Sequence, residues 1–66
     1  MQILVNGREQ ETSAAQTVEE LLKDLGYQQS QVAVALDGEF LPRRLYAATK
    51  LQDQMDLEIL LPMQGG

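Results

Sequence analysis

The sequence predicts a small α+β domain in which a mixed sheet of four to five strands carries one main helix on one face. Three observations support this fold class. An Asn-Gly pair separates two strand-like segments at the start of the 66-residue chain. One amphipathic helical segment follows, and three further strand-like segments complete the chain. We therefore expect a single layer of helix on a single sheet.

The first two predicted strands form a hairpin over residues 1–5 and about 8–12. Asn6-Gly7 is a strong hairpin signal, because a type I′ turn needs positive φ at both central residues. The second strand is wholly polar, which suits the edge of a sheet.

The segment "TVEELLKDLG" predicts the helix. Thr17 can cap its start, and Glu20 stands three residues later, as in a capping box. Gly26 follows at the position where helices commonly end. Apolar residues with helical spacing give the helix one apolar face: Val18, Leu21, Leu22 and Leu25.

The second half predicts strands at about 32–36, 39–41 and 57–61. Asp37-Gly38 forms the turn between the first two of these, and the region between the last two is irregular, with Tyr46 expected in the core. The resulting order, β-β-α-β-β-β, describes a β-grasp domain. The first and last strands of such a domain lie side by side at the centre of the sheet.

Alternation of side chains assigns the two faces of the central strands. The predicted core layer is Met1, Ile3, Val5, Leu57, Ile59 and Leu61. Leu4 and Leu60 then fall on the opposite face, where we expect them to lie close together beside Ala33 and Ala35. They are either ordinary exposed leucines, which are common, or a patch that docks a protein partner.

Composition excludes several functions. The chain has no cysteine and no histidine, so thiol nucleophiles, imidazole bases and Cys/His metal sites are absent. Its net charge is −5 and Arg43-Arg44 is its only adjacent basic pair, which argues against nucleic acid. We also expect no membrane segment, and the lack of cysteine is compatible with the cytoplasm.

Residues 62–66 are predicted to be a flexible tail that follows the domain over residues 1–61. Pro62 cannot donate a hydrogen bond to a sheet. Gly65 and Gly66 lack a Cβ, so their backbone can enter a narrow channel in another protein and offer the terminal carboxylate. The alternative is an ordinary frayed end. Adenylation by ATP would make that carboxylate reactive, and a sulfur nucleophile could then displace AMP to leave a thiocarboxylate.

Several segments together resemble the ThiS family, the ubiquitin-like sulfur carriers of thiamine thiazole biosynthesis. They are "MQILVNG", "QTVEELL", "VAVALDGEFLPR", "LEI" and the terminal "GG". The resemblance implies that Gly66 is adenylated and thiocarboxylated and that Gly65 belongs to the same tail. It also agrees with Leu60 as an apolar contact with the activating enzyme, and the candidate partner-binding residues are Leu4, Leu60 and Met63.

The resemblance implies a carrier that is not itself an enzyme. Its expected partners are an adenylating enzyme similar to ubiquitin-activating enzymes, a sulfur donor protein and a thiazole synthase. ATP and magnesium would be bound by the activating partner, so no cofactor or metal is expected on this chain. Two alternatives stay open: a related carrier such as the small subunit of molybdopterin synthase, and a ubiquitin-like interaction module without tail chemistry.

Two positions depart from the family pattern. The family usually has Gly-Asp in the turn before the last strand, where this chain has Gln54 and Met55. It often has Trp where this chain has Tyr46. We therefore expect a different turn shape before the last strand.

Overall fold

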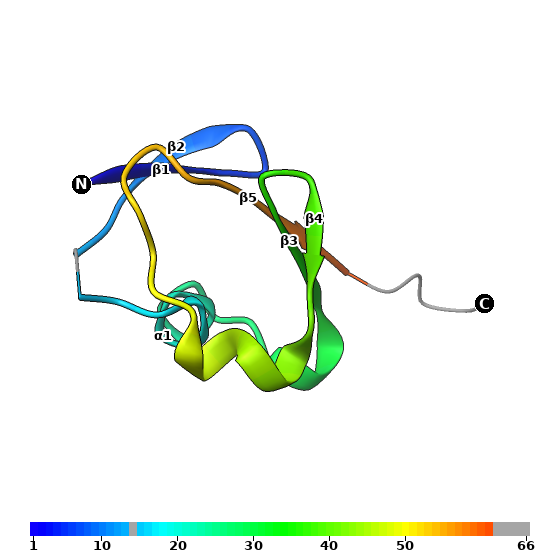
Figure 1. The fold of residues 1–66 in the computed structure, drawn as a ribbon. Coiled ribbons are helices and arrows are strands. Elements are labelled where there is room, and N and C mark those ends of the chain that lie inside the picture. Colours follow the sequence, from blue (N-terminus) through cyan, green and yellow to red (C-terminus); the bar gives the residue numbers. More distant parts are fainter. Residues whose placement is uncertain (14, 62–66) are drawn as a thin grey trace.

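A computed structural model describes residues 1–13 and 15–61 of the chain. The strands are β1 (Gln2–Val5), β2 (Arg8–Glu11), β3 (Ala33–Leu36), β4 (Glu39–Leu41) and β5 (Asp56–Leu60). The helix is α1 (Val18–Asp24), and two 3₁₀ segments are η1 (Gln29–Gln31) and η2 (Arg43–Ala48). Figure 1 shows α1 and η2 together on one side of the sheet. The predicted α+β fold class is confirmed.

The sheet has the order β2-β1-β5-β3-β4. β1 and β5 are parallel neighbours at its centre, whereas β1–β2, β3–β5 and β3–β4 are antiparallel (Figure 1). The prediction that the first and last strands lie side by side is therefore confirmed. This arrangement is a β-grasp sheet, and it places the end of β5 beside β3 rather than at an edge.

Both predicted hairpin turns are present. Asn6 and Gly7 have φ values of 52° and 84°, and Asp37 and Gly38 have 48° and 87°. These positive angles are the ones that a type I′ turn requires. Asp37 also holds the start of β5, because its Oδ1 accepts a hydrogen bond from the Asp56 amide at 3.0 Å.

The helix begins and ends where the sequence predicts. Thr17 Oγ1 accepts a hydrogen bond from the Glu20 amide at 3.2 Å, and Glu20 Oε1 accepts one from the Thr17 amide at 2.9 Å. Gly26 follows the C-cap with a φ of 87°. In the part of the chain that the structure describes, no helix is long and apolar enough to cross a membrane.

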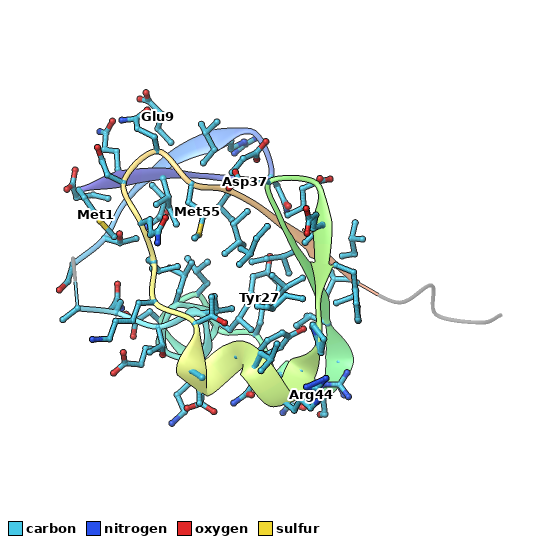
Figure 2. All side chains as sticks on the ribbon, viewed as in Figure 1. Met1, Glu9, Tyr27, Asp37, Arg44 and Met55 are labelled. Atoms are coloured by element: carbon cyan, nitrogen blue, oxygen red, sulfur yellow. The ribbon has the colours of Figure 1, made fainter. Side chains whose placement is uncertain are left out.

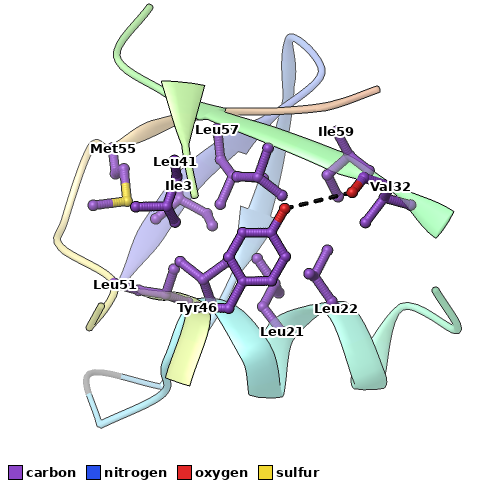
Figure 3. Packing of buried hydrophobic residues seen from close by; sticks show 12 residues of the cluster. Ile3, Leu21, Leu22, Val32, Leu41, Tyr46, Leu51, Met55, Leu57 and Ile59 are labelled. Atoms are coloured by element: carbon purple, nitrogen blue, oxygen red, sulfur yellow. Dashed lines mark hydrogen bonds between the residues drawn. The ribbon is translucent and has the colours of Figure 1, made fainter. Parts of the chain in front are cut away.

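The core fills the space between the sheet and the helical layer (Figure 3). Tyr46 is buried there, as predicted, and its hydroxyl lies 3.5 Å from the Val32 carbonyl oxygen. Ile3, Leu57 and Ile59 are buried on the predicted face, while Met1 and Val5 are partly buried. The prediction for Leu61 is wrong: it follows the last residue of β5, beyond the strand pairing, and is 63% exposed.

The turn before β5 contains Gln54 and Met55, the two residues that depart from the family's sequence pattern. Gln54 adopts a φ of 68°, in the left-handed region, and its amide donates to the Gln2 carbonyl at 2.7 Å. Met55 is buried and belongs to the core. Figure 2 shows its side chain just before β5, on the side of the sheet that faces the helical layer. An apolar side chain therefore occupies the place where the family usually has aspartate.

We predict that Gln54→Gly stabilises the protein. A left-handed conformation costs a residue with a Cβ about 1–2 kcal/mol, which exceeds the entropic cost of glycine. We expect the midpoint of thermal unfolding to rise by roughly 4 °C, measured by circular dichroism. A midpoint equal to or below that of the parent chain would show that this turn carries no such strain.

Candidate docking surface

The face of the sheet opposite α1 is open, and Leu60 lies on it near the end of β5. Its side chain is 54% exposed. Ala33 on β3 is its partner across the strands, and Ala35 lies two residues further along the same face. The sequence-based assignment of Leu60, Ala33 and Ala35 to one face is thus confirmed.

Leu4 shares this face but does not lie next to Leu60. The parallel pairing sets Leu4 level with Asp56, four residues before Leu60 on β5. At the usual rise of a strand, this separates the two leucines by about 13 Å along β5. The expectation that they lie close together is wrong, because β1 pairs only with the first part of β5.

Phe40 is the large apolar side chain of this face that the sequence analysis did not select. Phe40 lies on β4, where it pairs with Ala35 of β3, and its side chain is 70% exposed. Alternation along β4 could have identified Phe40. Leu41 points into the core, so its neighbour Phe40 must point outward. We define the apolar patch as Ala33, Ala35, Phe40 and Leu60.

Carboxylates border the apolar patch and surround Leu4. Glu58 pairs with Ala35, while Leu4 lies between Glu9 on β2 and Asp56 on β5. Figure 2 shows Glu9 pointing away from the helical layer. Across residues 1–13 and 15–61, no group of three Asp, Glu, His or Cys side chains is arranged to hold a metal ion.

A shallow groove of about 280 Å³ opens where β5 ends. It is lined by Ser30, Gln31, Val32, Ala33, Arg43, Leu60 and Leu61. Arg43 has a structural role here, because its Nε donates to the Gln29 carbonyl at 2.8 Å and so fixes the segment before β3. The groove continues the apolar patch as far as Leu61.

The tail residues of the sequence-based site lie outside the described part of the chain. These are Met63, Gly65 and Gly66. Leu61, the last described residue, is exposed beside Leu60. The apolar patch therefore lies next to the point from which residues 62–66 begin.

The fold and this surface define a ubiquitin-like β-grasp protein with an apolar patch beside its last strand. The family model for the ThiS family matches residues 3–66. The chain belongs to the ThiS family.

Two known proteins match this chain over all 66 residues. The sulfur carrier protein ThiS of Escherichia coli K12 is 35% identical over 66 residues, which cover all of both chains. A thiazole synthase of Paramagnetospirillum magneticum is 39% identical over 66 residues, and the chain spans 20% of the length of that protein.

Two solved structures are similar to this one. The crystal structure of a thiamine biosynthesis protein (ThiS) from Geobacter metallireducens has a TM-score of 0.85 and 36% identity, with complete coverage of both chains. A solution structure of a thiamine biosynthesis protein from the same organism has a TM-score of 0.78 and 38% identity, covering all of this chain and 88% of that one. Both similarities cover the whole of this chain.

Proposed function

We propose that this chain is a sulfur carrier of thiamine thiazole biosynthesis and not itself an enzyme. The observation that carries the proposal is the ThiS family match, which runs from Ile3 to Gly66 and so includes both the β-grasp fold and the terminal Gly-Gly. The comparisons favour thiamine biosynthesis over the molybdopterin alternative, since the relatives are a sulfur carrier protein ThiS, a thiazole synthase and thiamine biosynthesis proteins.

The proposed chemistry takes place at the carboxylate of Gly66. One of its oxygens attacks the α-phosphorus of ATP and pyrophosphate leaves, which forms an acyl-adenylate. Hydrosulfide delivered by the sulfur donor then attacks the carbonyl carbon and loses its proton while AMP leaves, and the product is a C-terminal thiocarboxylate. ATP and magnesium are bound by the activating partner. Gly65 and Gly66 suit this role, because a backbone without Cβ atoms fits a narrow channel.

The proposed partners are an adenylating enzyme similar to ubiquitin-activating enzymes, a sulfur donor protein and a thiazole synthase. A thiazole synthase with a segment 39% identical to this chain supports the last of these. The apolar patch and Leu4 are the proposed contacts on the domain, and Met63 is the proposed contact on the tail. Such a reaction belongs in the cytoplasm, where ATP is available.

Intact-mass spectrometry tests this function. The 66-residue chain is incubated with ATP, magnesium, an activating enzyme and a sulfur donor. We expect its mass to rise by the difference between one sulfur and one oxygen atom. A chain that ends at Gln64 is the control and should keep its mass. An unchanged mass of the 66-residue chain, with partners that modify another ThiS protein, would refute the proposal.

A further inference from the structure

Asn6 has a second role beyond the hairpin turn. Its backbone amide donates a hydrogen bond to the Leu57 carbonyl at 2.9 Å. This is the last backbone hydrogen bond between the β1 segment and β5. Its side-chain Oδ1 accepts a hydrogen bond from the Ile59 amide at 2.7 Å. Asn6 therefore binds two residues of β5, Leu57 and Ile59, which lie two positions apart on the same edge of the strand.

The side chain of Asn6 replaces its own backbone in the strand ladder. In a regular parallel pair, the next acceptor after the amide of Asn6 would be the carbonyl of Asn6. The backbone of Asn6 has a φ of 52° and turns away into the hairpin. The amide oxygen of its side chain occupies the acceptor position instead, so the pairing of β5 extends one rung beyond the end of β1.

The opposite edge of β5 is held independently. β3 pairs with β5 as far as Ala33 and Leu60. Leu60 and the apolar patch are therefore kept in place by β3, while the Ile59 amide on the other edge depends on Asn6. Ile59 itself is 5% exposed, so this amide is poorly reached by water. Loss of the acceptor would leave a shielded donor without a partner, which weakens the local structure.

We propose that Asn6 is a positioning residue for the sulfur-carrier reaction. Together with the β3 pairing at Leu60, the hydrogen bond to Ile59 fixes both edges of the last part of β5, from which the chain continues into the tail. This inference rests on the proposed function. The proposal assigns separate roles to two parts of the domain. The apolar patch determines how tightly a partner binds, and Asn6 determines how often the bound tail reaches the reacting position.

Asparagine combines the two properties that this position needs. It tolerates the left-handed conformation, and its side chain carries an acceptor at the required reach. Aspartate shares both properties. Glycine retains the conformation but has no acceptor. The pair Asn6→Asp and Asn6→Gly therefore separates the acceptor from the turn.

The test measures two quantities on each variant. The first is hydrogen exchange of the Ile59 amide, by NMR on the isolated chain. The second is the rate of adenylation as a function of carrier concentration. In Asn6→Gly we expect Ile59 exchange to become about five- to tenfold faster, the effect of one lost hydrogen bond. We also expect kcat to fall several-fold with KM unchanged, and Asn6→Asp to match the parent chain.

Gly7→Ala provides the matched control for a weakened turn. It strains the same turn, since Gly7 has a φ of 84°, but leaves the Asn6 acceptor in place. We expect it to lower the thermal midpoint without changing kcat. An equal loss of kcat in Gly7→Ala, unchanged kcat in Asn6→Gly, or an Asn6→Asp variant as slow as Asn6→Gly would each overturn the positioning role. If the parent chain is not adenylated at all, the proposed function fails, and this is seen before any variant is compared.

Discussion

Replacing Leu60 by glutamate should raise the KM for the carrier in the activation reaction about 30-fold or more. Central apolar anchors of interfaces typically contribute 2 kcal/mol or more, and each 1.4 kcal/mol corresponds to a factor of ten. Leu60 is 54% exposed and stands in the apolar patch, so the substitution removes an anchor and adds a charge without touching the core. Steady-state kinetics at increasing carrier concentration measures the effect.

Leu45→Glu is the matched control, because Leu45 is 37% exposed but lies on η2, on the helical side of the sheet. It should leave KM unchanged. Phe40→Ala should act in the same direction as Leu60→Glu, since both residues belong to the apolar patch. If Leu60→Glu keeps both the KM and the thermal stability of the parent chain, this surface is not part of the partner interface.

Replacing Leu57 by alanine should remove a large part of the stability of the domain. Leu57 is fully buried at the centre of the sheet, and truncating such a leucine costs about 3 kcal/mol through lost burial and the cavity left behind. The free energy of unfolding of a domain of this size is roughly 3–10 kcal/mol in total. We therefore expect the thermal midpoint to fall by roughly 15 °C, with a matching shift in urea denaturation.

Leu61→Ala is the comparison for this loss. Alternation assigns Leu61 to the same face as Leu57, yet Leu61 is 63% exposed because it follows the end of β5. We expect its thermal midpoint to stay within about 3 °C of the parent chain, as for most surface substitutions. Equal destabilisation by both variants would contradict the burial pattern of β5.

Local signals in the sequence predicted most of the fold. Asn6-Gly7 and Asp37-Gly38 defined the turns, since positive φ angles restrict the residue types there. Thr17 and Glu20 defined the helix start through two reciprocal hydrogen bonds. The predicted strand bounds agree with the structure to within one residue; β3, for example, begins at Ala33 rather than Val32.

Register between distant strands was not predictable in the same way. Alternation placed Leu4 and Leu60 on one face, but it carries no information about how far β1 slides along β5. Phe40 was overlooked because a single apolar residue in a three-residue strand has no periodicity of its own. The Asn6–Ile59 contact joins residues 53 positions apart and depends on that same register.

The central pairing of β1 with β5 has a consequence for the synthesis of the protein. Within this domain, β5 is synthesised after the other four strands, so β1 lacks its central neighbour until β5 has been made. Contacts between residues so distant in sequence form late and slowly. A partner that recognises the assembled sheet would therefore bind only domains whose last strand has been made and paired with β1.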